Sequence, residues 1–158
     1  MSKIIGIDLG TTFSAIAQLD DLGNPEVLAS TDSNKKITAS AVYVKNNNVV
    51  VGDKALDALA ATPKNVITET KRQMENDSIY SIETGEWVDK NENNKENFSP
   101  AQISSFILSK LKNYTSDVKK AVITVPALFA EKARVATLDA AKMAGIEVIS
   151  LINEPTAA

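Results

Sequence analysis

The segment Ile4–Thr12 reads Ile-Ile-Gly-Ile-Asp-Leu-Gly-Thr-Thr and predicts a strand that runs directly into a turn. Apolar residues on both sides of Gly6 favour an extended backbone up to Asp8. Because another alternating run, Phe13–Leu19, begins at once, only a tight turn fits over Leu9–Thr12. The chain is therefore expected to present a carboxylate at the mouth of a glycine-containing turn.

The chemistry of this turn suits a phosphate group and its cation. Gly10 permits a positive φ and a close approach of the backbone to a ligand, while Thr11 and Thr12 add hydroxyl donors. Asp8 suits Mg²⁺ that is held through water. From this segment alone, an ordinary turn after a buried strand is an equal alternative. A carboxylate that ends an apolar strand is, however, costly without a partner, which favours a site at Asp8.

Sequence motifs and composition limit the classes of function. The sequence contains no G-x-x-x-x-G-K-[ST], and no G-x-G-x-x-G opens a helix, so two common phosphate motifs are excluded. It also contains neither cysteine nor histidine, so acid–base or metal chemistry must use carboxylates, lysine and hydroxyl groups. The net charge of −3 and basic residues that cluster only in pairs disfavour nucleic acid or an anionic membrane as partner. Since no leader-like or membrane-spanning apolar run is present, we expect a cytoplasmic protein.

Three regions are expected along the 158 residues. Residues 1–34 are predicted to begin a core subdomain as an antiparallel meander, with a third strand at Glu26–Ser30. Residues 35–98 have the pattern of an inserted α+β subdomain with a modest core. Residues 99–158 are predicted to complete the core, truncated at their end. The predicted fold class is α/β, with a mixed sheet.

The insert is expected to hold a hairpin at Ala41–Val51 that turns at three consecutive asparagines, since asparagine tolerates left-handed conformations. Asp53 is expected to cap a helix that reaches about Ala61. Residues 91–97 are rich in asparagine and charge and predict a solvated loop or hairpin tip.

The second part of the core carries clearer signals. Ser99–Gln102 combines an N-cap serine, a proline at the first helical position and a glutamine that can close a capping box. Lys119–Val125 predicts a buried, parallel strand, and Gly145 is expected to end an alanine-rich helix over 130–144. With the strand Ile146–Ile152, these elements predict a βαβ unit.

The last residues predict a loop at Asn153–Thr156, with Thr156 poised to cap a helix whose first two residues are Ala157 and Ala158. We therefore expect the chain to be cut inside a larger domain.

Six separated motifs resemble, in order and approximate spacing, landmarks of the Hsp70 (DnaK-like) chaperones. These motifs are Ile5–Thr12, Val51–Asp53, Lys71–Arg72, Val122–Ala127, Arg134–Thr137 and Ile152–Ala158. The resemblance covers the whole chain and implies an actin-like ATPase lobe, a fold related to ribonuclease H. These residues would be most of one lobe of a nucleotide-binding domain that binds ATP or ADP with Mg²⁺.

By that resemblance, Asp8 would hold the hydration shell of Mg²⁺, while Gly10, Thr11 and Thr12 would bind the β- and γ-phosphates. Thr11 would lie nearest the transferred group. Phe13 falls in the same nucleotide-binding segment, but relatives often have asparagine or tyrosine there, so one polar contact is expected to be missing.

The resemblance implies that Lys71 places positive charge beside the γ-phosphate and orients the attacking water. Glu154 would position that water or accept its proton. Pro126 and Arg134 would relay the nucleotide state to a docked peptide-binding domain. Without the resemblance, each residue has an ordinary structural interpretation. Lys71 would belong to a solvated helix face, and Glu154 would be an ordinary loop residue. Pro126 would end a strand, and Arg134 would make a helix more soluble. Residues 73–75, Gln-Met-Glu, replace the usual apolar pair and glycine, which predicts a different local turn after Lys71.

The function implied is that of a chaperone ATPase whose nucleotide state sets its affinity for unfolded or extended client peptides, with a J-domain co-chaperone and a nucleotide-exchange factor as further partners. Two alternatives share the ATPase core: an actin-like filament protein and a sugar-kinase relative. The fragment alone is expected to hydrolyse little ATP, because the resemblance assigns adenosine to a second lobe.

Overall fold

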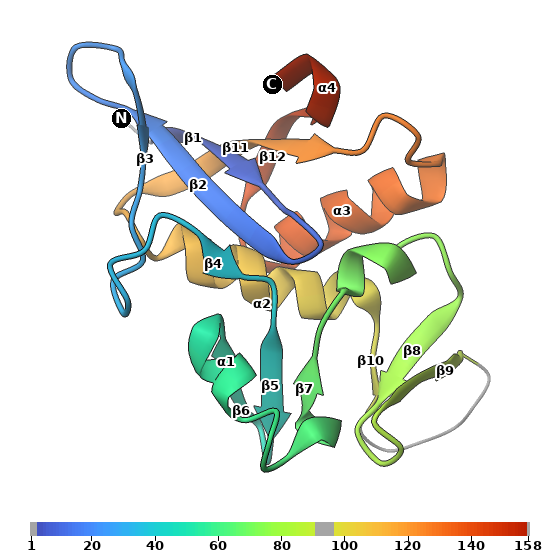
Figure 1. Ribbon diagram of the computed structural model, residues 1–158. Coiled ribbons are helices and arrows are strands. Elements are labelled where there is room, and N and C mark those ends of the chain that lie inside the picture. The colour runs from blue at the N-terminus through green and yellow to red at the C-terminus, as the bar shows by residue number, and fades with distance from the viewer. Residues whose placement is uncertain (1–2, 91–96, 158) are drawn as a thin grey trace.

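The computed structural model describes residues 3–90 and 97–157, which are arranged around one six-stranded mixed sheet (Figure 1). The strand order is β12-β11-β1-β2-β3, and β4 pairs with β2. The strands are β1 (Lys3–Asp8), β2 (Phe13–Leu19), β3 (Pro25–Val27), β4 (Thr38–Ala39), β11 (Val118–Val125) and β12 (Glu147–Asn153). β1 runs antiparallel to β2 and parallel to β11, which is itself parallel to β12, so the predicted meander and βαβ unit share one sheet.

Helices α2 (Pro100–Lys112) and α3 (Glu131–Met143) lie on one side of this sheet, and the short α4 (Glu154–Ala157) lies on the other (Figure 1). Side chains alternate between the two faces of β1. Ile5 and Ile7 are each 1% exposed and belong to the core, whereas the preceding Ile4 is 55% exposed. Ile103 of α2 is fully buried in the same cluster. One face of the sheet therefore carries the main hydrophobic core.

Residues between the two parts of the core form two small sheets. The first has the order β6-β5-β7 and is joined by α1; its elements are β5 (Val42–Lys45), β6 (Asn48–Val51), α1 (Asp53–Asp57) and β7 (Val66–Ile67). The second has the order β10-β8-β9, with β8 (Ser78–Ser81), β9 (Glu86–Asp89) and β10 (Asn97–Phe98). Two 3-10 turns, η1 (Pro63–Asn65) and η2 (Thr70–Gln73), connect these elements. The loop predicted over 91–97 lies outside the described residues apart from its last position.

Several local predictions are confirmed. Ser99 Oγ accepts a hydrogen bond from the Gln102 N–H at 3.2 Å, and Gln102 Oε1 accepts one from the Ser99 N–H at 2.8 Å, which is the predicted capping box. Gly145 follows α3 with a φ of +68°. Asn46 and Asn47 turn the β5–β6 hairpin with φ values of 49° and 62°.

Four expectations are wrong in detail. The helix expected to reach about Ala61 ends at Asp57. The third strand is Pro25–Val27 rather than Glu26–Ser30. Asp53 does not cap α1: Gly52 is the N-cap residue, and the Asp53 carboxylate instead pairs with Lys35 Nζ at 2.6 Å. Thr156 is not a cap either, because the β12 ladder continues to Asn153 and α4 begins at the next residue. No loop separates strand from helix there, and Glu154 is placed directly at their junction.

The boundaries proposed at 34/35 and 98/99 stay predictions. β4 lies inside the range 35–98 but pairs with β2 of the main sheet, with Phe13 opposite Ala39 and Ser14 opposite Thr38. The start of the insert is thereby attached directly to the strand that follows the glycine turn.

Candidate functional site

A cleft of about 520 Å³ opens where β1 and β11 end. Its lining includes six of the residues predicted from the sequence: Asp8, Gly10, Thr11, Lys71, Pro126 and Glu154. These residues come from segments up to 146 positions apart, since Asp8 and Glu154 lie near opposite ends of the chain. Thr12 and Phe13 do not line this cleft.

Asp8 is the last residue of β1, and its side chain is exposed to the cleft. Thr124 lies opposite it on the parallel strand β11, and the Thr124 hydroxyl donates to Asp8 Oδ1 at 2.8 Å. Within residues 3–90 and 97–157, Asp8 has no cationic partner. Thr124 was not predicted as a site residue from the sequence, because its place beside Asp8 depends on the register of β1 and β11.

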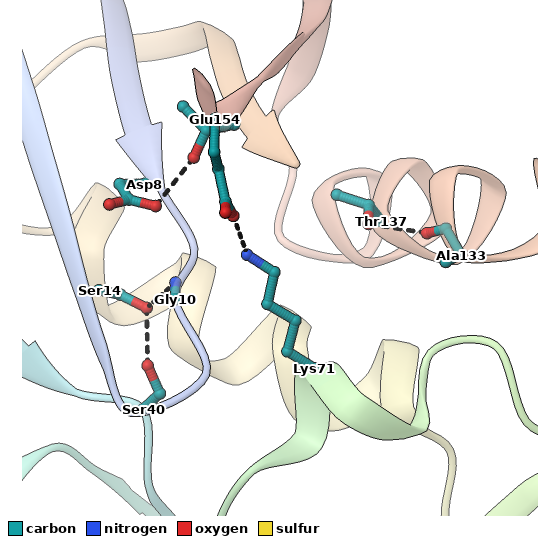
Figure 2. A network of polar contacts seen from close by, with 9 residues as sticks. Asp8, Gly10, Ser14, Ser40, Lys71, Ala133, Thr137 and Glu154 are labelled. Atoms are coloured by element: carbon teal, nitrogen blue, oxygen red, sulfur yellow. Dashed lines mark hydrogen bonds and ion pairs between the residues drawn. The ribbon is translucent and has the colours of Figure 1, made fainter. Parts of the chain in front are cut away.

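The turn requires glycine at position 10, but for a reason other than the predicted positive φ. Gly10 does not have a positive φ. Instead, a Cβ atom at this position would lie 1.9 Å from the carbonyl oxygen of Phe13, a distance that no side chain can occupy. The Gly10 N–H donates to Ser14 Oγ at 3.2 Å and so is used inside the protein (Figure 2). Thr11 is the hydroxyl of the turn that lines the cleft.

Lys71 and Glu154 meet across the cleft (Figure 2). Lys71 Nζ lies 2.5 Å from Glu154 Oε1 and 5.7 Å from the ring centroid of Phe129. The Lys71 side chain is only 9% exposed and the Glu154 side chain 41% exposed. Lys71 is therefore not part of a solvated helix face; it lies in η2, and its ammonium group is desolvated and paired.

Two of the residues that follow Arg72, Met74 and Glu75, are held by contacts within the protein. Met74 is 2% exposed and fills an apolar position. Glu75 Oε1 accepts a hydrogen bond from the Ala130 N–H at 3.1 Å, at the residue that precedes α3. Residues 73–75 thus contact the start of α3, and Lys71 lines the cleft.

Pro126 and Arg134 lie near each other but make different contacts. Pro126 follows β11 and lines the cleft. Arg134 is in α3 and outside the lining: its Nε donates to the Phe129 carbonyl at 3.2 Å, and its Nη2 donates to Asn153 Oδ1 at 2.9 Å. Asn153 immediately precedes Glu154. Arg134 is therefore more than a solubilising residue, because it joins α3 to the end of β12.

Comparison with known proteins decides the family. A family model described as Hsp70 protein matches residues 4–158. The chain belongs to the Hsp70 family. It is similar to the chaperone protein DnaK of Carsonella ruddii (strain PV), with 40% identity over 179 aligned positions that include 100% of this chain. This Hsp70 chain spans 29% of the length of that relative.

Membership of the Hsp70 family confirms the actin-like ATPase fold, and neither match supports the filament or sugar-kinase alternatives. In the described part of this Hsp70 chain, every helix is too short or too polar to cross a membrane.

Proposed function

We propose that this protein is an ATP-dependent Hsp70-type chaperone, and that residues 1–158 form the part of its nucleotide-binding domain that contacts the phosphates of Mg-ATP. The observation that carries the proposal is the meeting of Asp8, Gly10, Thr11, Lys71 and Glu154 around one cleft. Phosphoryl transfer requires this kind of placement of charge and hydrogen-bond donors more than covalent chemistry.

Asp8 would hold Mg²⁺ through water. Its carboxylate is exposed to the cleft and oriented by Thr124, which supports this role. When bound, the cation neutralises part of the phosphate charge. Thr11 and Thr12 would bind the β- and γ-phosphates, and Phe13 would flank them without a polar contact.

Lys71 and Glu154 would act on the water that attacks the γ-phosphate. Because their ion pair is formed in the structure, phosphate oxygens must compete with Glu154 for the Lys71 ammonium. Once Lys71 donates to the phosphate, the Glu154 carboxylate is free to accept a hydrogen bond from the water. Glu154 would then orient the water, or take its proton as the bond to phosphorus forms.

A closed circuit of contacts supports the relay role of Pro126 and Arg134. Lys71 contacts both Glu154 and the Phe129 ring; Arg134 binds the Phe129 carbonyl and the residue before Glu154. A change of partner at Lys71 would therefore alter the contacts of the segment from Pro126 to Phe129. We infer that this segment passes the nucleotide state to the peptide-binding part of the protein.

The partners proposed for the whole protein are unfolded or extended client peptides, a J-domain co-chaperone and a nucleotide-exchange factor, and the proposed location is the cytoplasm. The curated relative is named as a chaperone, which supports these proposals. They concern the whole protein, of which the described residues would supply part of the nucleotide site.

The chaperone function is tested with the full-length protein and a fluorescent extended peptide. We expect the peptide to dissociate faster with Mg-ATP than with Mg-ADP, because the γ-phosphate competes for Lys71. Equal dissociation rates with both nucleotides, or sedimentation of the protein as ATP-dependent polymers, would contradict the chaperone function.

Residues 1–158 alone are expected to hydrolyse little or no ATP, because the adenosine site is proposed to lie on another lobe. Turnover of radiolabelled ATP by this fragment and by the full-length protein provides the comparison. Rapid turnover by the fragment that disappears in its Lys71→Met variant would show that half of the proposed site is sufficient.

A further inference from the structure

Two buried serine side chains lie beneath the glycine turn (Figure 2). Ser14 is in β2 and 1% exposed; Ser40 follows β4 and is 5% exposed. Their hydroxyl oxygens are 2.8 Å apart, although the residues are separated by 26 positions. Neither side chain lines the cleft, and neither was singled out as functional from the sequence.

The pair is attached to both ends of the turn. At one end, Ser14 Oγ accepts the hydrogen bond from the Gly10 N–H at 3.2 Å. At the other end, the Ser40 N–H donates to the Thr12 carbonyl at 2.8 Å. The Ser14–Ser40 hydrogen bond joins these two contacts, so both ends of the Gly10–Thr12 segment are held by the same pair of residues.

The chemistry of the pair explains why serine is found at positions that a strand core would normally fill with apolar side chains. A serine hydroxyl has one hydrogen and two lone pairs, so Ser14 can accept from Gly10 and still bond to Ser40. Without the Ser14 hydroxyl, the Gly10 N–H would lose its partner inside the protein. The Gly10 amide would then be free to turn, and Thr11 beside it would lose its fixed position.

We propose that Ser14 and Ser40 are positioning residues that hold the Gly10–Thr12 turn in the conformation required by the nucleotide phosphates. This inference rests on the proposed function. Since Ser40 belongs to the segment that links β4 to β5, the pair also makes the geometry of the turn depend on the placement of the inserted residues. Loss of either hydroxyl should weaken only the binding of the phosphates, because the serines do not line the cleft and are bonded to the turn that would hold the phosphates.

The test uses Ser14→Ala and Ser40→Ala in the full-length protein, with Ser105→Ala as matched control. Ser105 is also a buried serine, 7% exposed, but its hydroxyl bonds to the Gln102 carbonyl within α2, away from the cleft. For each variant, Mg-ATP and adenosine affinities are measured by competition against a fluorescent nucleotide, and thermal unfolding is recorded. Adenosine carries no phosphate, so it reports damage that is not specific to the turn.

We expect Ser14→Ala to weaken Mg-ATP binding about fivefold, the equivalent of one ordinary hydrogen bond, while adenosine affinity is unchanged. Ser40→Ala should have a smaller effect in the same direction, and the double variant should match Ser14→Ala because the two hydroxyls act as one unit. Ser105→Ala should alter neither affinity. If Ser14→Ala does not fold, the Mg-ATP and adenosine affinities of Ser40→Ala become the test. This variant should fold more readily, because it keeps the Gly10–Ser14 hydrogen bond.

The inference is overturned if the deciding variant binds Mg-ATP as tightly as the wild type, or loses ATP and adenosine affinity equally. Either result would leave the proposed function intact, since the wild type would still bind Mg-ATP. Failure of the wild-type protein to bind Mg-ATP would instead remove the proposed function, and this inference with it.

Discussion

Gly10→Ala is expected to lower the free energy of unfolding by about 2 kcal/mol and to weaken Mg-ATP binding at least about tenfold, because it overpacks the turn and misplaces the groups that bind phosphate. The alanine Cβ would lie 1.9 Å from the Phe13 carbonyl oxygen, so the backbone of the turn has to move. Its movement would break the Gly10–Ser14 hydrogen bond and displace Thr11. Urea unfolding and titration calorimetry of the full-length protein measure the two effects.

Gly23→Ala is the matched control for this variant. Gly23 lies in the β2–β3 turn with a φ of +84°, and a Cβ atom there meets nothing within 4 Å. We expect alanine to cost about 1 kcal/mol through its strained left-handed conformation, with no change in nucleotide affinity. If Gly10→Ala resembles this control, losing stability but not Mg-ATP affinity, the turn does not bind the phosphates.

Lys71→Met is expected to slow ATP hydrolysis about 100-fold while Mg-ATP binding changes far less, because a preorganised charge acts mainly on the transition state. Methionine keeps the apolar stem that packs near Phe129 and removes only the ammonium group. The fold should survive, since the Glu154 carboxylate left behind is 41% exposed and can be hydrated. Single-turnover hydrolysis with prebound ATP separates chemistry from binding.

Arg72→Met provides the neighbouring control. The Arg72 side chain is 66% exposed and pairs with Glu69 at 2.9 Å, three residues earlier. A surface pair of this kind contributes little to stability, and Arg72 does not line the cleft. Its loss should leave the single-turnover rate unchanged. Equal rates for Lys71→Met and wild type would remove Lys71 from the catalytic role.

Local signals in the sequence were sufficient for much of the fold. Strand alternation in residues 4–19, the capping box at Ser99 and the glycine after α3 each depend on neighbours within a few positions, and each is confirmed. The Asp53 cap failed because Lys35, 18 positions away, competes for that carboxylate. Long-range competition of this kind has no signature in the local sequence.

The candidate site shows the same limit. Asp8 could be proposed from the strand and turn alone, but Lys71 and Glu154 could be assigned only through the resemblance, since nothing local marks a lysine as one that will pair 83 positions away. The reason that position 10 requires glycine could not be predicted from the sequence either. It is the approach of the turn to the Phe13 carbonyl and not the φ of Gly10. Thr124 and the Ser14–Ser40 pair became visible only once strand register was known.

Asp8 and the adjacent turn are proposed to bind the phosphates of a magnesium nucleotide. The most direct test is calorimetric titration of full-length Asp8→Asn with ATP, with Mg²⁺ present and with Mg²⁺ chelated. Asparagine retains an oxygen that can accept from Thr124 but removes the negative charge. We predict that affinity falls about tenfold with Mg²⁺ and is unchanged without it. Unchanged affinity in the presence of Mg²⁺ would contradict the claim.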